Sequence, residues 1–383
     1  MALLYRHVAL NIDDKMTQRI PDKMPDKTLA AVLAQFGHTV AECQISALGN
    51  GLINSTYLVT TPNNRFVLQH INQDVFTKPE QVIANADLLS AHLSAKSVEN
   101  SYALTPIWQL PSKSNESHVI VEKQYWRALH YIDNSYTVET VTNSKQASSV
   151  ASAFAHFANA LNDFDASQLA DIIPQFHDLS MRVTQLEQAI ASSTTPLLTQ
   201  AQSDIDFIRS QQIFIDSIAE ITTALPLRVT HNDTKINNLL FSHRNNEPIA
   251  VIDLDTCMAG YLMHDFGDMV RSCCSSIAED SAELDDMSIN FDILSALTST
   301  YIAGFNGTLT EIEQSSLLVG IKLMPFMLSM RFLTDFLNGD KYFKSDYATH
   351  NLVRAQNQLQ LYKLYCQHDE RLKNIIAGHN KHQ

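Results

Sequence analysis

The chain has 383 residues, of which 45% are apolar and 18% are charged. This length and composition fit a globular protein large enough for two lobes with a buried core. Acidic side chains outnumber basic ones by 41 to 27, so the net charge at neutral pH is −14. Because no run of lysine and arginine offsets this charge, we exclude a general nucleic-acid binder and a protein that binds anionic membranes.

Two features of the sequence predict a cytoplasmic protein that does not enter a membrane. The apolar part of residues 1–14 is too short for a signal peptide, and no apolar run reaches the length of about 18 residues that crosses a bilayer. The five cysteines are odd in number, and the adjacent Cys273 and Cys274 are expected to be buried thiols on a helix. Free thiols are typical of a reducing cytoplasm. The sequence leaves the oligomeric state open.

The first third of the chain predicts a small lobe rich in strands. Residues 1–26 are polar, contain Pro21 and Pro25, and are expected to form a leader segment. The small lobe is then expected over residues 27–132, where turn residues between two alternating runs predict a hairpin. In chain order, the predicted elements are a helix at 27–37, hairpin strands at 53–60 and 65–71, a helix at 81–95, and strands near 102–109, 117–124 and 126–132.

From residue 133 to residue 383 the pattern changes to apolar residues three and four positions apart, which indicates amphipathic helices. The switch near residue 132 is therefore the predicted domain boundary and hinge. This second domain is expected to be a mostly helical lobe, with helices at 147–161, 201–224, 263–278, 289–306, 310–337 and 349–376.

One short segment between these helices carries residues suited to catalysis. It reads His231-Asn-Asp233-Thr-Lys235-Ile-Asn-Asn238, and Asp253 follows 20 residues after Asp233. Asp233 is a candidate base, and Asn238 and Asp253 offer the oxygen ligands that Mg²⁺ prefers. The transfer of a phosphoryl group from ATP–Mg²⁺ to a hydroxyl requires these kinds of group.

Short apolar runs place the candidate ligands on a predicted hairpin. Strands are expected at 225–230, 238–241 and 249–255, with turn residues between the last two. If these two strands pair across the turn, Asn238 lies about 5 Å from the residue that precedes Asp253. Asp253 and Asp255 are two apart on a strand and are expected to face the same side. The alternative is a surface hairpin with incidental acids.

Six segments of the chain resemble the aminoglycoside phosphotransferase and choline kinase superfamily, and within it the N-acetylhexosamine 1-kinase group. They are Gly49-Asn-Gly51-Leu-Ile-Asn54-Ser-Thr-Tyr57, the catalytic segment, Ile252-Asp-Leu-Asp-Thr256, Asp265-Phe-Gly-Asp-Met-Val-Arg271, Arg331-Phe-Leu-Thr-Asp335 and His350-Asn-Leu-Val-Arg354. The resemblance implies an α+β, protein-kinase-like two-lobe fold. Its small β-rich N-terminal lobe covers the nucleotide, and its larger, mostly helical C-terminal lobe carries the catalytic and acceptor-binding residues. ATP and Mg²⁺ are the implied cofactors.

The same resemblance implies roles for the residues of the catalytic segment. Asp233 is the catalytic base that accepts the proton of the acceptor hydroxyl. Asn238 and Asp253 hold Mg²⁺, and Asp255 is a second acidic contact near the phosphates. Lys235 is a candidate contact to the phosphate, with a solvated side chain as the equal alternative.

Other positions are interpreted as contacts to the substrates. Arg331 and Tyr342 match positions that contact the sugar, together with the catalytic base. An arginine buried without a partner costs several kcal/mol, so Arg331 needs sugar hydroxyls, a phosphate or a carboxylate, and a plain salt bridge is the alternative. Asn54 matches a position near sugar or phosphate. Gly49 and Gly51 precede a strand and are interpreted as facing the phosphates, although such a pair is usually only a turn.

Two residues are expected to support the catalytic loop, and two depart from the resemblance. Asp265 is interpreted as a brace that binds the backbone of the loop, and His231 as a packing residue. Leu52 stands where the group tends to have histidine, so a polar contact from the glycine loop is lost. Gln69 stands where protein kinases place the lysine that binds the α- and β-phosphates.

The leading hypothesis is an ATP- and Mg²⁺-dependent kinase that phosphorylates the anomeric hydroxyl of an N-acetylhexosamine or a related free hexose. Choline, homoserine or an aminoglycoside is the alternative acceptor. Choline and aminoglycosides need acidic or aromatic cages for their cations, which Arg331 and Tyr342 do not supply. The third hypothesis is a pseudokinase that binds sugar or nucleotide, and the presence of a base with its metal ligands argues against it.

Overall fold

The computed structural model describes residues 26–49 and 53–378. The chain divides into two compact units, one from Met1–Asn72 and Leu110–Tyr131 and one from Gln73–Gln109 and Ile132–Gln383. The boundary between Tyr131 and Ile132 lies one residue before the predicted boundary, which follows residue 132. The segment Gln73–Gln109 falls in the second unit, although the sequence places it in the small lobe. The reason is that helix α2 (Pro79–Val98) buries Leu89 and Leu93 in the core of the second unit.

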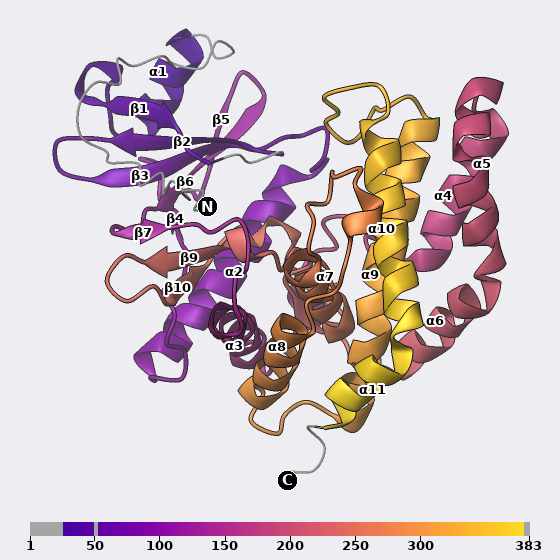
Figure 1. The fold of residues 1–383 in the computed structure, drawn as a ribbon. Coiled ribbons are helices and arrows are strands. Elements are labelled where there is room, and N and C mark those ends of the chain that lie inside the picture. Colours follow the sequence, from indigo (N-terminus) through magenta and orange to yellow (C-terminus); the bar gives the residue numbers. More distant parts are fainter. Residues whose placement is uncertain (1–25, 50–52, 379–383) are drawn as a thin grey trace, which may run out of the picture. The chain divides into compact units, whose positions relative to one another are not determined.

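The first unit is built on a six-stranded sheet of order β1-β2-β3-β6-β4, with β5 paired to β6 (Figure 1). The strands are β1 (Gln44–Ala47), β2 (Ser55–Thr60), β3 (Arg65–His70), β4 (Gln109–Leu110), β5 (Val119–Val121) and β6 (Gln124–His130). The predicted hairpin is confirmed, because β2 and β3 pair antiparallel over their full length. The strand predicted near 102–109 is wrong apart from its last residue. Pro106 lies in the middle of that segment and has no N–H to donate to a sheet.

Helix α1 (Asp26–Gln35) confirms the predicted first helix and completes the core of this unit. It buries Leu29, Val32 and Leu33 in one apolar cluster with side chains of the sheet, including Trp126. A short turn of 3₁₀ helix, η1 (Val40–Glu42), leads from α1 to the sheet.

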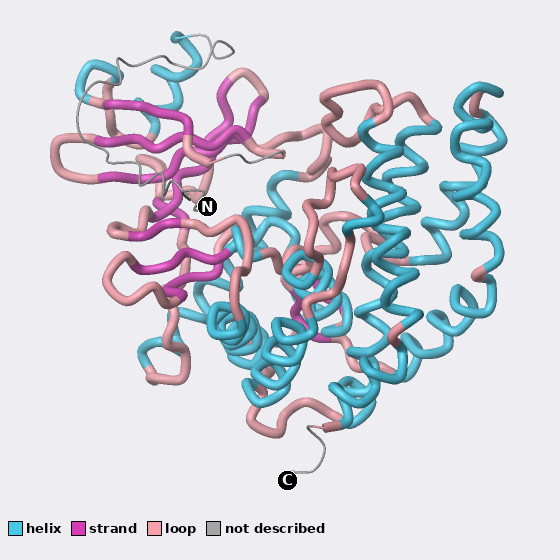
Figure 2. Tube along the Cα trace, in the orientation of Figure 1, coloured by secondary structure: helices cyan, strands magenta, loops and turns pink. Residues whose placement is uncertain are grey.

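The second unit is mostly helical, as predicted (Figure 2). Besides α2, its helices are α3 (Ser144–Ala160), α4 (Leu179–Ser192), α5 (Thr195–Ser210), α6 (Gln212–Ala224), α7 (Leu262–Cys274), α8 (Phe291–Gly304), α9 (Glu311–Leu337), α10 (His350–Gln367) and α11 (Asp369–Ala377). Two of the longer predictions, at 201–224 and 349–376, are each two helices, broken at Gln211 and His368. Helix α4 has no counterpart in the prediction.

Helix α9 is the centre of the second unit, with α7 and α10 packed along it (Figure 1). It starts at a capping box in which Thr310 and Glu313 bind each other's backbone N–H groups. The crossing with α7 is close because two glycines meet there. A Cβ on Gly267 would lie 2.2 Å from the carbonyl oxygen of Gly320, and one on Gly320 would lie 2.0 Å from that of Met263. This crossing holds the start of α7 firmly in the core.

Among the described residues, α9 is also the one helix long and apolar enough to cross a membrane by length and composition. Its most apolar window is 67% buried inside the protein, which is the behaviour of a core helix. Cys273 and Cys274 are buried near the end of α7, as predicted, and all five cysteines are free thiols.

Five short strands in the second unit frame the catalytic segment. They are β7 (Ser135–Tyr136), β8 (Arg228–Thr230), β9 (Leu239–Ser242), β10 (Pro248–Val251) and β11 (Met258–Gly260). They form two small sheets, β10-β9-β7 and β11-β8. The catalytic segment is therefore a loop that leaves one sheet at Thr230 and enters the other at Leu239.

Candidate active site

Asp265, in the first turn of α7, shapes the catalytic loop. Its two carboxylate oxygens accept the backbone N–H groups of His231 at 2.8 Å and Asn232 at 2.7 Å. Its carbonyl oxygen accepts the hydroxyl of Thr234 at 2.5 Å. Burial raises the pKa of Asp265 to about 6, although the two N–H groups favour its ionised form. The side chain and the backbone of this one buried residue thus hold His231, Asn232 and Thr234, on either side of Asp233.

His231 is a packing residue of this loop. Its side chain is fully buried, and its Nε2 lies 2.9 Å from the carbonyl oxygen of Ile252. The rings of Phe154 and Phe157 meet it edge to face, with centroids at 5.7 Å and 5.9 Å. The imidazole therefore joins the loop to the strand that precedes Asp253, and it is closed off from solvent.

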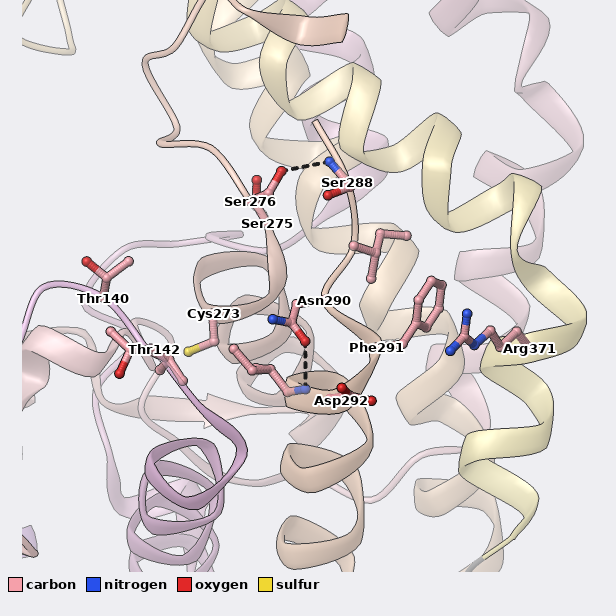
Figure 3. A pocket seen from close by; sticks show the side chains of 13 residues that line it. Thr140, Thr142, Cys273, Ser275, Ser276, Ser288, Asn290, Phe291, Asp292 and Arg371 are labelled. Carbon is pink, nitrogen blue, oxygen red and sulfur yellow. Dashed lines mark hydrogen bonds between the residues drawn. The ribbon is translucent and has the colours of Figure 1, made fainter. Parts of the chain in front are cut away.

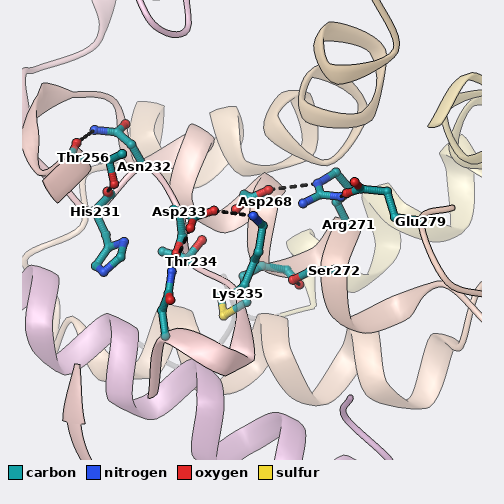
Figure 4. A network of polar contacts seen from close by, with 12 residues as sticks. His231, Asn232, Asp233, Thr234, Lys235, Thr256, Asp268, Arg271, Ser272 and Glu279 are labelled. Atoms are coloured by element: carbon teal, nitrogen blue, oxygen red, sulfur yellow. Dashed lines mark hydrogen bonds and ion pairs between the residues drawn. The ribbon is translucent and has the colours of Figure 1, made fainter. Parts of the chain in front are cut away.

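Both carboxylate oxygens of Asp233 are held by neighbouring side chains (Figure 4). Oδ1 lies 2.7 Å from Nζ of Lys235, and Oδ2 accepts Nδ2 of Asn238 at 2.8 Å. Burial opposes ionisation of Asp233, but the charge of Lys235 and the hydrogen bonds outweigh it, so the pKa of Asp233 is lowered. The side chain of Asp233 is still 28% exposed. It is an ionised, oriented carboxylate that a small molecule can reach.

A chain of paired charges extends from the loop through α7 (Figure 4). Nε of Arg271 lies 2.9 Å from Oδ1 of Asp268, and its Nη1 lies 2.5 Å from Glu279. Glu279 also pairs with Arg354 on α10 at 2.7 Å. The charges of Asp233 and then of Asp268 raise the pKa of Lys235. Oδ2 of Asp268 is buried and has no hydrogen-bond partner among the described residues.

The backbone near Asp253 lies beside Asn238, and Asp255 is buried in the turn that follows Asp253. The backbone N–H of Ile252 donates to the carbonyl of Asn238 at 2.9 Å, so Asn238 lies opposite the neighbour of Asp253 as expected. The strand ends at Val251, however, and Asp253 has the left-handed conformation, with φ of 60°. A 3₁₀ turn, η4 (Leu254–Thr256), follows, in which Asp255 is only 2% exposed.

The prediction that Asp253 and Asp255 face the same side is therefore wrong. Alternation of faces requires extended backbone, and the left-handed residue breaks it. Asp253 is exposed, and Asn238 uses its amide nitrogen for Asp233, which leaves its amide oxygen for another partner. One carboxylate and one amide oxygen side by side fit a Mg²⁺ ion that takes its other ligands from phosphates and water.

Arg331 lies among aromatic rings. Its guanidinium carbon is 5.0 Å from the ring centre of Phe176, 5.4 Å from that of Phe343 and 6.0 Å from that of Tyr342. Burial lowers the pKa of Arg331, while Tyr342 and the more distant Asp233 favour its charged form. Among the residues that the structure describes, Arg331 forms no ion pair. The salt bridge considered as the alternative for this residue is thus not formed.

The predicted nucleotide contacts lie in the first unit. Gly49 is exposed with φ of +71°, a conformation that favours glycine. Gly51 and Leu52 lie outside the described residues. Oδ1 of Asn54 accepts the backbone N–H of Asn72 at 3.0 Å, so this side chain ties the start of β2 to the chain after β3.

Gln69 has a cationic neighbour that the sequence reading did not identify. Its Oε1 accepts Nε of Arg127 at 3.0 Å and Nη2 at 2.8 Å. The two residues are paired across β3 and β6. A guanidinium therefore lies on the strand next to the position where protein kinases carry a lysine. Knowledge of the register between β3 and β6 would have been needed to predict this pairing.

Three further polar residues of the second unit also lacked an assigned role. They are Asp268 in α7, His177 just before α4, and Arg182 in the first turn of α4. The signal for α4 was present, because Asp178 caps it by accepting the N–H of Met181 at 3.0 Å.

A pocket of about 540 Å³ lies elsewhere in the second unit, and none of the predicted site residues lines it (Figure 3). Its polar groups already bind one another. Asn290 accepts the N–H of Ile293 at 3.1 Å at the start of α8, and Ser276 accepts that of Ser288 at 2.8 Å. Arg371 lies 3.6 Å over the ring of Phe291. Several of its polar groups are thus used within the protein, and the pocket contains none of the residues of the predicted site.

Comparison with known proteins agrees with this geometry. The profile of the phosphotransferase enzyme family matches residues 44–289. An aminoglycoside phosphotransferase from Alicyclobacillus acidocaldarius subsp. acidocaldarius has 14% identity and a TM-score of 0.56, covering 96% of this chain and 97% of that one. Choline kinase from Cryptosporidium parvum Iowa II has 14% identity and a TM-score of 0.52, with coverages of 90% and 94%. Spectinomycin phosphotransferase, solved with ADP and spectinomycin, has 11% identity and a TM-score of 0.50, with coverages of 94% and 99%.

At these identities the solved structures establish the fold alone, and the family match covers more than half of the chain. Together they confirm the expected superfamily and the α+β, protein-kinase-like fold. The narrower N-acetylhexosamine kinase group stays a prediction. The chain belongs to the phosphotransferase enzyme family, and it is a small-molecule kinase.

Proposed function

We propose that this protein transfers a phosphoryl group from ATP to a hydroxyl of a small molecule, with Asp233 as the catalytic base. One observation carries the proposal. The carboxylate of Asp233 is held at both oxygens, by Lys235 and Asn238, on a loop that Asp265 fixes, and its side chain remains 28% exposed. An oriented, ionised carboxylate is thus placed where a small molecule can reach it.

The lowered pKa of Asp233 keeps its side chain ionised at neutral pH. The carboxylate orients the acceptor hydroxyl and takes its proton as the bond to phosphorus forms. Lys235, at 2.7 Å, places a positive charge beside the carboxylate and next to the path of the phosphoryl group. Phosphoryl transfer depends mainly on such positioning and charge stabilisation.

Asn238 and Asp253 would hold Mg²⁺, which would supply positive charge to stabilise the negative charge of the phosphates. Because Asp255 is buried in the turn after Asp253, we assign it to support of that turn and no longer to the ion. In the first unit, Gly49 and Asn54 remain the proposed nucleotide contacts. ADP in the solved spectinomycin phosphotransferase supports a nucleotide donor.

For the acceptor, we propose the anomeric hydroxyl of an N-acetylhexosamine or a related hexose, bound by Arg331 and Tyr342. Arg331 and Asp233 attract each other electrostatically but form no ion pair, which supports a position of Arg331 beside the acceptor. A cationic acceptor such as choline or an aminoglycoside would be repelled by an unpaired guanidinium. The retained base and metal ligands argue against a pseudokinase, and the free cysteines support a cytoplasmic enzyme.

An ADP-release screen with ATP and Mg²⁺ tests the proposal. The acceptors are N-acetylglucosamine, N-acetylgalactosamine, galactose, choline and homoserine, and phosphorus NMR locates the new phosphate in each product. We expect turnover of a hexose with the phosphate on its anomeric oxygen. Phosphorylation of choline or homoserine alone would remove the sugar assignment and leave the kinase chemistry standing.

A further inference from the structure

Two arginines from different helices converge on one aromatic residue of the second unit. Arg331 on α9 lies with its guanidinium carbon 5.0 Å over the ring of Phe176. Arg182 on α4 donates Nη2 to the backbone carbonyl of the same Phe176 at 2.6 Å. The two cations are close enough that each disfavours the charge of the other, and burial together with Arg331 lowers the pKa of Arg182 to about 10.

Neither arginine has a counter-ion among the described residues. Asp178, the carboxylate next to Arg182 in the sequence, is used to cap α4. The charges that reach Arg331 come from Asp233 and Asp268, and these carboxylates are already paired with Lys235 and Arg271. Two guanidinium groups without a carboxylate leave an excess of positive charge at this place.

Two histidines beside the arginines also have unused polar atoms. The rings of His177 and His264 lie 4.7 Å apart. The ring nitrogens of both histidines are buried. Those of His264 have no hydrogen-bond partner in the part of the chain that the structure describes, and the one group near enough to His177 to favour its charged form through a hydrogen bond there is the backbone of Asn232. Nε of Arg182 is also buried and has no hydrogen-bond partner among the described residues. A buried polar atom without a partner is costly, and His264, only 4% exposed, directly precedes Asp265. These unused atoms therefore adjoin the catalytic loop.

We call Arg182, Arg331, His177 and His264 the arginine–histidine cluster. Resting on the proposed kinase function, we infer that its two arginines bind an anionic oxygen group, a carboxylate or a phosphate, on the acceptor alcohol. Guanidinium groups match both groups in charge and hydrogen-bond geometry. The neutral imidazoles, each with one donor and one acceptor nitrogen, bind hydroxyls next to that group. The preferred acceptor is then a hexose or N-acetylhexosamine that also carries a carboxylate or phosphate, and the neutral sugars are weaker acceptors.

Binding of matched ligand pairs tests this inference. Calorimetric titration in saturating ADP and Mg²⁺ compares glucose with glucuronate, and N-acetylglucosamine with N-acetylglucosamine 6-phosphate. The first pair differs by a carboxylate and the second by a phosphate. We expect at least one acid to bind about tenfold or more tightly than its neutral partner, since charge-assisted bonds are the strong ones. In Arg182→Gln the ratio should fall to about one.

Two further variants separate binding from folding. Arg182→Lys keeps the charge without the planar guanidinium and should keep part of the preference. Arg209→Gln changes an exposed arginine on α5 that pairs with Glu187, and it should keep the whole preference. A melting temperature for each variant checks that it is folded.

The inference is overturned if neither acid binds more tightly than its neutral partner, or if Arg182→Gln and Arg182→Lys both keep the full preference. Its failure differs from failure of the proposed function. Turnover of neutral hexoses without any preference for acids overturns only the inference. Turnover that survives Asp233→Asn overturns the proposed function, whatever the titrations give.

Discussion

The catalytic loop and the arginine–histidine cluster differ in whether their charged side chains have partners within the protein. In the loop, Asp233 is paired with Lys235, and Asp265 accepts two backbone N–H groups. In the cluster, Arg182 and Arg331 repel each other, and neither forms an ion pair with a described residue. The loop is therefore complete within the protein, whereas the cluster leaves its charge for a ligand.

This difference shows where the protein fixes geometry in advance. A base must be oriented before the substrate arrives, and hydrogen bonds from a rigid helix do this at no cost during the reaction. A binding group gains affinity only if its partner comes from outside, so leaving it unpaired favours binding over stability. Changes in the loop should accordingly lower turnover, and changes in the cluster should alter the use of the acceptor.

After loss of the base itself, the largest effect is expected from loss of the metal. Asp253→Asn should lower turnover roughly a hundredfold or more, because charge stabilisation by a metal is worth several kcal/mol. Excess chelator should abolish turnover in the unchanged protein, and added Mg²⁺ should restore it. The matched control is Asp216→Asn, on α6, whose carboxylate binds only Gln212. Equal turnover of the Asp253 variant and this control would show that the ion is held elsewhere.

A smaller loss is expected from Asp265→Asn. The oxygen of the new amide can still accept one of the two backbone N–H groups. Its nitrogen is a donor and faces the other N–H group, which costs about 1–3 kcal/mol. Turnover should fall roughly tenfold at neutral pH because the loop loosens. In the unchanged protein, turnover should fall below about pH 6, where Asp265 takes up a proton, and the variant should lack this step. A wild-type profile that is flat from pH 5 to 7 would contradict the brace.

The same carboxyl links stability to pH in the opposite direction. The pKa of this carboxyl is about 6 in the folded protein, and its ordinary value is 3.8. Between pH 3.8 and pH 6 the folded protein therefore binds more protons at Asp265 than the unfolded protein does. The contribution of Asp265 to the unfolding free energy is full below about pH 4 and falls as pH rises to 6. The stability of the unchanged protein relative to Asp265→Asn should follow this trend in urea titrations. A relative stability that rises with pH would show that the carboxyl is not shifted upward.

In the cluster, the expected effect is confined to use of the acceptor. Arg331→Ala should raise the KM of the acceptor about tenfold, the size of one charged hydrogen bond, and leave the affinity for ATP unchanged. Initial rates at varied acceptor and nucleotide concentrations measure both constants. Arg209→Ala is the control with both constants unchanged. If the affinity for ATP fell instead, Arg331 would belong to the nucleotide site.

The sequence predicted those parts that depend on neighbours along the chain. The hairpin of β2 and β3, the helix predicted at 310–337 and the spacing from Asp233 to Asn238 are local patterns, and each has its expected form. The left-handed backbone at Asp253 was not predictable in this way, because alternation along a strand assumes that the strand continues.

The cluster was beyond sequence reasoning for a different reason. Arg182 and Arg331 are 149 residues apart, and only the packing of α4 on α9 brings them together. Because helix α4 was not predicted, Arg182 and His177 could not be placed near Arg331. The breaks at Gln211 and His368 lack glycine or proline, so the helix pattern runs through them.

The most direct test of Asp233 as the catalytic base compares Asp233→Asn with the unchanged protein. Turnover and nucleotide affinity are measured for both, with the best acceptor of the screen. The amide keeps the shape of the side chain but cannot take the proton of the hydroxyl. We expect turnover to fall about a thousandfold, within the range for loss of a general base, with the Kd for ATP–Mg²⁺ nearly unchanged. Turnover close to that of the unchanged protein would show that Asp233 is not the base.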